Sequence, residues 1–281
     1  MKVAAIQLCS TTDLFANLEA TSDALCRAAE QGAELAVLPE NFACYAGDYR
    51  ALAEQQGQSL PQWVAERTRE LGLWVVAGTL PMLERPDGQA VPAPRVRAAS
   101  LLFAPDGSLS ARYDKLHLFD AQVDDSQGRY CESDVFEPGD RVCVAEAGPV
   151  KLGMAVCYDL RFPALAGLLR DRGANLLVYP SAFTAVTGAA HWELLLRARA
   201  VETGCYVLGA GQCGQHDERR RSHGHSMLVD PWGRVVRSLG GEPGVLVEEI
   251  DIARLEEIRH RLPVHKHQRL VTGLAHDISE C

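Results

Sequence analysis

Short and almost wholly apolar segments recur along this chain, and the way they are connected constrains the fold most. The apolar stretch at 3–8 is followed by apolar residues at helical spacing over 14–29, and then by a second apolar stretch at 34–40. Near-continuous apolar runs are typical of strands that are covered on both faces. Other segments adjoin through turn signals such as Asp106-Gly107, which predict hairpins. Because helical crossovers join parallel strands and hairpins join antiparallel ones, mixed sheets are predicted.

The same patterns continue to the end of the chain. Further strands are predicted over 73–80, 96–103, 110–115, 150–157, 175–180, 205–211 and 244–250 and in a hairpin over 226–239, with helices over 61–71, 163–172, 191–203 and 252–261. The 281 residues contain no Pro-, Gly- and Ser-rich linker and no short repeat, and 47% are hydrophobic, which is enough for a full core. The sequence therefore predicts an α/β protein with one domain over 1–281, in which two sheets pack face to face and helices lie outside.

Charge, cysteine content and hydropathy narrow the classes of function. The formal net charge of -9 disfavours binding to a phosphate backbone, and the single basic cluster, Arg219 to Arg221, is interpreted as a solvated loop. No segment approaches the ~18 apolar residues of a membrane helix, and the N-terminus is interpreted as a first strand and not a secretory signal. Nine cysteines without a C-x-x-C pair argue against a disulfide framework and a thiolate zinc site. We therefore expect a cytoplasmic protein that binds neither nucleic acid nor membrane.

Three potentially reactive residues each follow a predicted strand. Glu40 ends "LAVLPE", Lys115 ends "SARYDK" and Cys157 ends "GMAVC". Taken singly, the glutamate and the lysine are typical of solvated loops, and the cysteine is typical of a small buried hydrophobic residue. Functional residues of open α/β sheets gather beyond the carboxyl ends of strands, however, and these three side chains together are what acyl-transfer chemistry requires.

The chemistry assigns a role to each of the three. A thiol with an ordinary pKa near ~8.5 is mostly protonated at neutral pH, and we expect a nearby ammonium and the N-terminus of the helix starting at Pro163 to stabilise its thiolate. A carboxylate can accept the thiol proton, pass it to a leaving nitrogen and then deprotonate water. Lys115 would face the oxyanion, where one donor is typically worth ~3 kcal/mol, and the backbone N–H of Tyr158 is the second expected donor.

These motifs resemble the nitrilase superfamily of carbon–nitrogen hydrolases. The resemblance is carried by "LPENF" with Glu40, "YDKLHLFD" with Lys115 and "CYDLRFP" with Cys157, in this order, and extends over essentially the whole chain. It implies a four-layer α-β-β-α sandwich and catalysis without a metal or an organic cofactor. It also implies a homodimer, formed through the helix after the nucleophile and C-terminal segments, with the tail over about 262–281 in the dimer contact.

A second glutamate commonly accompanies the lysine in this family. Glu132 lies at the corresponding place, in "YCESDVFEPGD", where it would orient Lys115 and the substrate amide. A carboxylate beside an ammonium keeps the ammonium charged. The neighbours Asp134 and Glu137 are alternatives for this role, and a plain surface-loop glutamate is a third possibility.

The later segments resemble one branch of the family. The segments concerned are "YPSAFTAVTGAAHWELLLRARAVETGCYVLGAGQCG" and "SHGHSMLVDPWG". They are similar to amidases that hydrolyse deaminated glutathione to 2-oxoglutarate and cysteinylglycine. The second resemblance is to the closely related ω-amidases, which convert α-ketoglutaramate to 2-oxoglutarate and ammonia. Both small-molecule substrates carry an α-keto carboxylate, for which the guanidinium of Arg161 is the expected partner. The alternative for Arg161 is a structural salt bridge, for instance with Asp159. By resemblance Phe183 and Thr187 line the same pocket, although Phe183 is also a candidate core residue.

Other interpretations remain open from sequence alone. A nitrilase attacking C≡N, an acyltransferase delivering the thioester to an amine, and a non-catalytic interaction protein all belong to the range that this scaffold allows. The pairs His223/His225 and His265/His267 lack a third ligand at a characteristic spacing, so no metal site is predicted there. His191 is interpreted as a capping or packing residue at a helix start.

Overall fold

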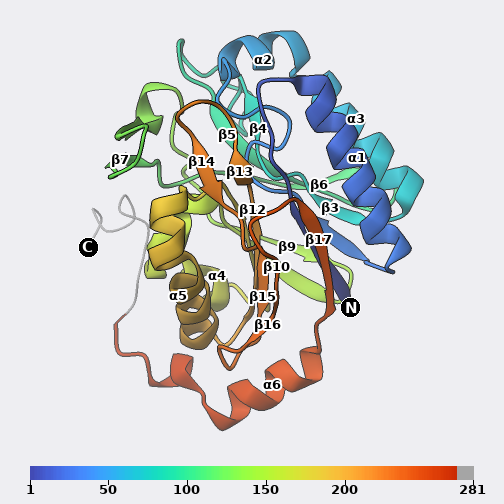
Figure 1. The fold of residues 1–281 in the computed structure, drawn as a ribbon. Helices are drawn as coiled ribbons and strands as arrows, with labels where there is room; N and C mark the ends of the chain where they lie inside the picture. Colours follow the sequence, from blue (N-terminus) through green and yellow to red (C-terminus); the bar gives the residue numbers. More distant parts are fainter. Residues whose placement is uncertain (271–281) are drawn as a thin grey trace.

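A computed structural model describes residues 1–270, in which two mixed sheets pack face to face between two layers of helices (Figure 1). The first sheet has the strand order β17-β1-β2-β3-β5-β4, and β6 pairs with β5. Its strands are β1 (Lys2–Gln7), β2 (Leu35–Val37), β3 (Trp74–Val76), β4 (Leu80–Met82), β5 (Arg97–Phe103), β6 (Leu109–Asp114) and β17 (Gly244–Glu249). The strands β1, β2 and β3 run parallel, and the remaining pairs in this sheet are antiparallel.

The second sheet has the strand order β16-β15-β12-β11-β10-β9. Its strands are β9 (Cys143–Ala147), β10 (Val150–Met154), β11 (Leu176–Ser181), β12 (Tyr206–Gly211), β15 (Met227–Val229) and β16 (Val235–Ser238). The central strands β10, β11 and β12 are parallel, and antiparallel strands flank them on both sides. Two small hairpins lie outside these sheets, namely β7 (Asp120–Gln122) with β8 (Arg129–Cys131), and β13 (Cys213–Gln215) with β14 (Arg221–His223).

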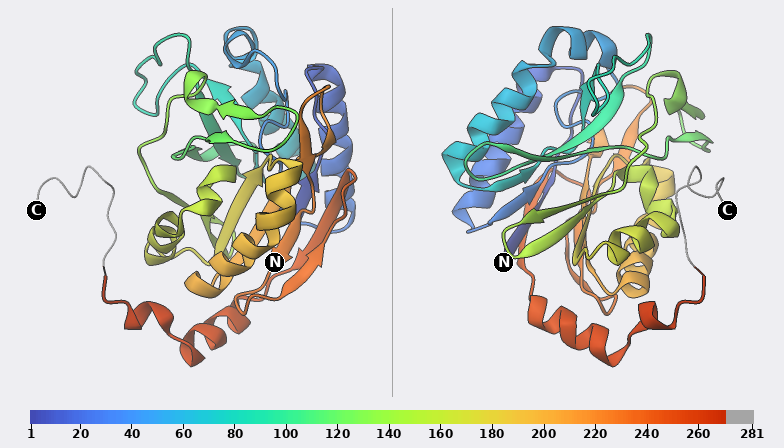
Figure 2. Two further views of the ribbon diagram at one scale, coloured as in Figure 1. Left: turned by 60° about the vertical axis from the view of Figure 1, so that its left-hand side comes forward. Right: turned by 180° about the vertical axis from the view of Figure 1, so that it is seen from behind.

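Most of the helices form the two outer layers, and the last α-helix of the described chain runs across the bottom of the molecule (Figure 1). The α-helices are α1 (Leu14–Glu30), α2 (Tyr49–Gln56), α3 (Ser59–Leu71), α4 (Pro163–Asp171), α5 (Ala185–Thr203) and α6 (Ile252–Arg261), with the short 3-10 helices η1 (Glu132–Asp134), η2 (Cys157–Arg161) and η3 (Val264–His267). Seen from three directions, α1 and α3 cover one side of the paired sheets, and α4 and α5 cover the other (Figures 1 and 2). The prediction of an α-β-β-α sandwich is therefore confirmed.

The alternation of side chains along β1 explains why its sequence is apolar throughout. Val3 and Ala5 belong to the core between the two sheets, whereas Ala4 and Ile6 belong to the core under α1 and α3. Successive side chains of a strand point to opposite faces, so a strand between two packed layers buries both sets. All four side chains are fully buried.

The two sheets are connected where the inner strands β1 and β12 end, and this connection positions the loops that follow the strands. Leu8, just after β1, forms a parallel bridge with Gln212, just after β12, and the Cys213 N–H donates to the Leu8 carbonyl at 2.8 Å. The carboxyl ends of the parallel strands of both sheets are thereby brought to the same end of the sandwich. Loops that leave β1, β2, β10, β11 and β12 consequently lie close together, although they are far apart in the sequence.

Local differences from the sequence prediction have local causes. The helix predicted over 191–203 begins at Ala185, because the Thr184 side chain caps it by accepting a hydrogen bond from the Thr187 N–H at 3.2 Å. The sequence prediction also omitted α2, β9 and both small hairpins, whose strands are too short to show a periodicity. The predicted tail over 262–281 lies outside the described residues beyond position 270. Within residues 1–270, no helix has the length and apolar character that a membrane crossing requires.

Candidate active site

A buried lysine and two glutamates meet below the carboxyl edge of the sheets. The Lys115 Nζ, directly after β6, lies 2.8 Å from Glu40 Oε1 and 2.9 and 2.8 Å from the two carboxylate oxygens of Glu132. The Glu132 carboxylate also accepts a hydrogen bond from the Phe119 N–H at 2.7 Å, which fixes its orientation. The structure thus brings together three residues that are separated by up to 92 positions in the sequence.

The charge of Lys115 is stabilised by its partners. Its side chain is only 1% exposed, so burial acts against the charged form, but the Glu132 and Glu40 carboxylates outweigh burial and hold the pKa of Lys115 well above its usual value. An ammonium group has three N–H donors, and two carboxylates use at least two of them. One donor can therefore face a further oxygen atom next to Glu40.

The two rival acids occupy other positions. Glu137 accepts hydrogen bonds from Arg85 and Arg97, and the hydrogen bond from Arg85 is the main reason that its pKa falls to about 2. Asp134 is exposed on η1. Of the three acidic residues considered for contact with Lys115, the structure places only Glu132 there.

The loop carrying Glu40 is held by its neighbours on both sides. Gly78, at a φ of +33°, lies so close to Pro39 that a side chain would collide with the Pro39 carbonyl group. Asn41 has a φ of +56° and donates its N–H to Thr79 Oγ1 at 2.9 Å, and Gln212 donates to the Glu40 carbonyl at 3.0 Å. Glu40 itself is 3% exposed, and burial raises the pKa of its carboxyl group, against the lowering effect of Lys115.

Cys157 lies at the first position of η2 in an unusual backbone conformation. Its φ of +47° places it in the left-handed region, which is strained for a residue with a Cβ atom. Cys157, Glu40 and Ala182 line the same cavity. Tyr158 follows in the first turn of η2, where backbone N–H groups have no intrahelical acceptor.

The resting state of the thiol differs from the sequence-based expectation. Burial, reinforced by the Glu40 charge, raises the pKa of Cys157 well above its usual value, and Lys115 only partly opposes this rise. Lys115 lowers the pKa of the thiol, as expected from the sequence, but Cys157 is only 8% exposed and the opposite effect of desolvation is larger. Burial and the Glu40 charge therefore favour a protonated thiol, and Glu40 on the same cavity is the carboxylate that can accept its proton.

Asp159 connects the cysteine segment to the lysine segment. Its fully buried carboxylate accepts hydrogen bonds from the Tyr113 hydroxyl at 2.7 Å, the Val156 N–H at 2.8 Å, and the N–H and Nδ1–H of His117 at 3.0 and 2.7 Å. Tyr113 and His117 stand two residues before and after Lys115. Asp159 thus anchors the turn, and it does not pair with Arg161.

A cavity opens above these residues. Glu40, Glu132 and Cys157 line it together with Ala182 and Thr184, which follow β11. Its other walls carry aromatic side chains and two arginines, namely Tyr45, Tyr49, Phe119, Tyr130, Phe136, Arg129 and Arg220. A concave site that combines apolar walls with a few convergent polar groups is the usual form of a small-molecule site.

The predicted substrate-binding residues Arg161, Phe183 and Thr187 lie beside this cavity and do not line it. The guanidinium carbon of Arg161 is 5.2 Å from the ring centre of Phe183 and 5.8 Å from that of Tyr158, and Arg161 Nη1 donates to His191 Nδ1 at 3.2 Å. Thr187 contacts the cavity residue Thr184 through hydroxyl groups 2.9 Å apart. Phe183 is buried and packs against Trp192, as expected for a core residue.

Sequence reasoning missed Arg129 and Arg220 as cavity residues. Arg220 belongs to the run Arg219 to Arg221, for which the sequence predicts a solvated loop, yet it lines the cavity. The sequence signal for it is that this run is the single basic cluster of an acidic chain. Arg129 stands alone in an acid-rich segment, and nothing in the sequence distinguishes it from a surface arginine. Within residues 1–270, no group of three or more His, Cys, Asp and Glu side chains is arranged to hold a metal ion.

Comparisons with known proteins agree with this geometry. The family model described as carbon-nitrogen hydrolase matches residues 2–260. The deaminated glutathione amidase of Yersinia enterocolitica is 42% identical, and the match covers 99% of this chain and 96% of that protein. The crystal structure of Saccharomyces cerevisiae Nit3, described as a member of branch 10 of the nitrilase superfamily, is 30% identical with a TM-score of 0.84 over 96% of this chain and 97% of that one.

The C. elegans NitFhit crystal structure is 36% identical with a TM-score of 0.85, and the match covers 95% of this chain but 65% of that longer chain. These similarities and the family match over nearly the whole length show that the chain belongs to the carbon–nitrogen hydrolase family. It is a nitrilase-superfamily hydrolase that acts on non-peptide carbon–nitrogen bonds. The resemblance noted from its motifs is thereby confirmed.

The Asp159 anchor generates the first prediction. Asp159→Asn would turn an amide N–H₂ toward donors that now meet a carboxylate, so we expect a loss of about 3 kcal/mol in the free energy of unfolding. Denaturant titration measures this loss, and Asp23→Asn on the exposed face of α1 is the control, expected to change stability by less than about 0.5 kcal/mol. Equal stability of the two variants would contradict the anchoring role.

Proposed function

We propose that this protein is a thiol amidase that hydrolyses the terminal amide of an α-keto acid, most specifically deaminated glutathione. The observation that carries the proposal is the buried contact of Lys115 with both Glu40 and Glu132 at the base of a cavity that also exposes Cys157. The name of the Yersinia enterocolitica relative supports the choice of substrate. The products would be 2-oxoglutarate and cysteinylglycine.

The proposed reaction begins at Cys157. Glu40 accepts the thiol proton as the sulfur attacks the amide carbonyl carbon, and a tetrahedral intermediate forms. The remaining N–H of the Lys115 ammonium and the backbone N–H of Tyr158 donate to its oxyanion. Glu40, now protonated, gives the proton to the leaving nitrogen, the C–N bond breaks, and a thioester with Cys157 remains.

The thioester is then hydrolysed. Water enters next to Glu40, which accepts one of its protons while the oxygen attacks the thioester carbonyl carbon. The second tetrahedral intermediate collapses, the C–S bond breaks, and the proton on Glu40 returns to the sulfur. Glu132 takes no proton in this sequence: its two contacts hold the Lys115 ammonium charged and in place.

A second candidate function is that of an ω-amidase. Arg161 is proposed to bind the α-keto carboxylate, which α-ketoglutaramate and deaminated glutathione share, so Arg161 does not separate the two substrates. No acidic residue within positions 1–270 pairs with the Arg161 guanidinium, which leaves it available to a carboxylate. Binding there requires the stacked Arg161 to turn toward Cys157 from its contacts with Tyr158 and Phe183.

Side-by-side kinetics tests the proposed function. We expect wild-type protein to show a kcat/KM at least ~10-fold higher on deaminated glutathione than on α-ketoglutaramate, and no turnover of an aliphatic nitrile. Cys157→Ala is expected to lose more than about 10³-fold in kcat, because no other thiol-bearing residue holds this position. Mass spectrometry of quenched wild-type enzyme should detect the acyl adduct on Cys157, and an adduct elsewhere would contradict the mechanism.

The pH dependence provides an independent test of Glu40. Glu40 is a base only when ionised, so kcat/KM falls as the pH drops through its pKa. Because the Glu132 charge is one of the causes that raise the pKa of Glu40, Glu132→Gln should move the acid limb of the profile to lower pH, and it should also lower kcat. The exposed neighbour provides a control, Asp134→Asn, for which no displacement is expected. A displacement to higher pH in Glu132→Gln would oppose the assignment.

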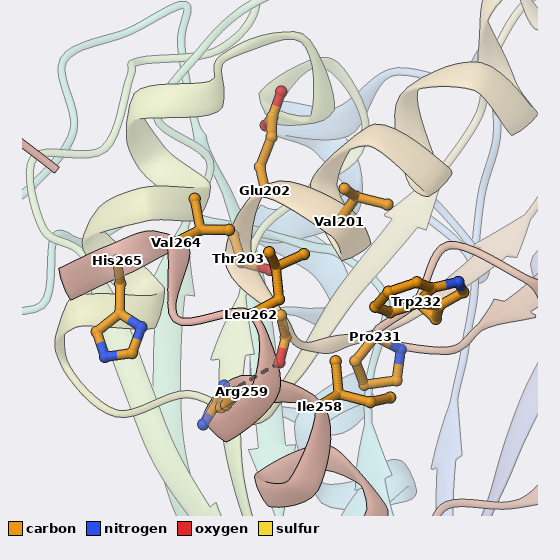
Figure 3. Close-up of a pocket in the computed structure, with 11 residues that line it drawn as sticks. Val201, Glu202, Thr203, Pro231, Trp232, Ile258, Arg259, Leu262, Val264 and His265 are labelled. Carbon is orange, nitrogen blue, oxygen red and sulfur yellow. Dashed lines mark hydrogen bonds between the residues drawn. The ribbon is translucent and has the colours of Figure 1, made fainter. Parts of the chain in front are cut away.

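We also infer that the single domain acts as a homodimer, and that it works in the cytoplasm, where the free thiols of its described cysteines would stay reduced. Exposed apolar side chains gather on the outer face of α5 and around its C-terminal end: Leu194, Val201, Trp232, Leu262 and Val264. Four of these, Val201, Trp232, Leu262 and Val264, line the pocket between α5 and α6 in Figure 3. A contiguous exposed apolar surface is typical of a protein interface.

The size of the particle in solution tests the dimer. Leu194 is 65% exposed, and Leu194→Asp should convert the protein to a monomer in light scattering at micromolar concentration, because it would bury a charge in the interface. Phe15 is 83% exposed on α1, on the opposite outer layer, and Phe15→Asp is the matched control that should leave the dimer intact. A wild-type monomer, or dissociation of both variants, would contradict the interface.

A further inference from the structure

We propose that Arg220, assisted by Arg129, binds a carboxylate on the leaving-group side of the scissile amide. The enzyme would then favour leaving amines that are amino acids or short peptides with a free C-terminus, over ammonia. This inference rests on the proposed amidase function and specifies the substrate class of that same site.

The two arginines reach the cavity from separate hairpins. Arg220 precedes β14 and Arg129 begins β8, and both line the cavity that contains Cys157. Within residues 1–270, the Arg220 guanidinium has no hydrogen-bond or ion-pair partner, and Arg129 pairs with no carboxylate, its Nε donating to Cys131 Sγ at 3.2 Å. Two guanidinium groups without an acid partner on one cavity form a site for a carboxylate.

The backbone at Arg220 is fixed before any ligand binds. Asp217 Oδ1 accepts the N–H groups of Arg219 and Arg220 at 2.8 and 2.7 Å, and the Arg220 carbonyl accepts from the His216 N–H at 2.9 Å. His216 in turn donates from Nδ1 to the Ser10 carbonyl at 2.7 Å and accepts at Nε2 from the Ser222 hydroxyl at 2.8 Å. A turn held in this way loses little conformational freedom when a ligand binds.

Two tyrosines share the cavity with the Arg220 guanidinium. Tyr45 and Tyr130 both line the cavity that Arg220 lines. The Tyr45 ring packs against His216 with ring centres 4.1 Å apart. A carboxylate at Arg220 would therefore be bordered by aromatic side chains and by a rigid turn.

The proton path decides which end of the substrate faces Arg220. Glu40 protonates the leaving nitrogen, so this nitrogen and the group attached to it must lie on the Glu40 side of the carbonyl carbon. Tyr45 and Tyr49 follow Glu40 in the chain and line the cavity, and the Tyr45 ring packs against His216 in the turn that carries Arg220, which places this wall with Arg220 on the Glu40 side. Arg161 instead continues the helix of Cys157 and packs outside the cavity lining.

Two separate cationic positions fit a substrate with two carboxylates. Deaminated glutathione carries one carboxylate on its acyl part and a second at the end of the cysteinylglycine leaving group. α-Ketoglutaramate carries only the first and releases ammonia. Arg161 would serve the acyl carboxylate of both, whereas Arg220 with Arg129 has a partner only in the dipeptide-bearing substrate.

The test compares three substrates: deaminated glutathione, the same compound with its C-terminal carboxylate converted to a carboxamide, and α-ketoglutaramate. Wild-type kcat/KM should fall ~10–100-fold from the acid to the carboxamide, the size expected when a charged hydrogen-bond partner is lost. Arg220→Gln should lower kcat/KM on deaminated glutathione by ~10–100-fold. Its loss in kcat/KM on α-ketoglutaramate should be smaller by a factor of at least ~10. The variant should also no longer distinguish the acid from the carboxamide. Arg129→Gln should show a smaller loss in the same direction.

The exposed neighbour provides the matched control, Arg219→Gln, which removes the same charge from the same turn and should behave as wild type. The carboxamide comparison needs no variant, so a misfolded Arg220→Gln would not leave the question open. Wild-type enzyme that is active on deaminated glutathione but indifferent to the carboxamide would overturn the role of Arg220 alone. Equal losses of Arg220→Gln on all three substrates would do the same, whereas inactivity of wild type on deaminated glutathione would overturn the proposed function as well.

Discussion

A buried ammonium group determines how this molecule is organised around its site. Lys115 is almost completely enclosed, and its charge is tolerable only because Glu40 and Glu132 contact it at 2.8 Å. Removing a buried charge from all partners costs several kcal/mol, so the loops after β2 and β6 and the helix η1 are stable only when they meet. The same contacts leave a carboxylate, a charged donor and a thiol at the base of one cavity.

Neutral and charged hydrogen bonds behind the cavity keep this arrangement rigid. Asp159 connects the segment after β10 to the segment around Lys115, and Gln212 connects the loop after β12 to the backbone of Glu40. Both connections join different sheets of the sandwich. Each is buried, so its loss would leave polar groups without partners.

The electrostatics of the site indicate a thiol that stays unreactive until a base removes its proton. Burial holds Cys157 protonated, and the strained backbone at its φ of +47° presents the sulfur next to Glu40. In the proposed reaction Glu40 therefore carries two different protons, first from the thiol to the leaving nitrogen and then from water to the sulfur. Arg161 and Arg220, which are proposed to recognise the acyl part and the leaving group, lie on different elements around this centre.

The sequence by itself determined the layers of the fold and indicated which residues are proposed to react. Apolar runs such as Val3 to Ile6 can be buried only between two layers, and Glu40, Lys115 and Cys157 each follow a predicted strand within a family motif, so the layers and the candidate residues were predictable from local pattern and motif. Choosing Glu132 over Glu137 needed the tertiary structure, because partners distant in the sequence decide which acid meets Lys115. The same holds for the protonation of Cys157 and for the place of Arg220 in the cavity, since desolvation and the meeting of two hairpins depend on packing and leave no trace in local sequence.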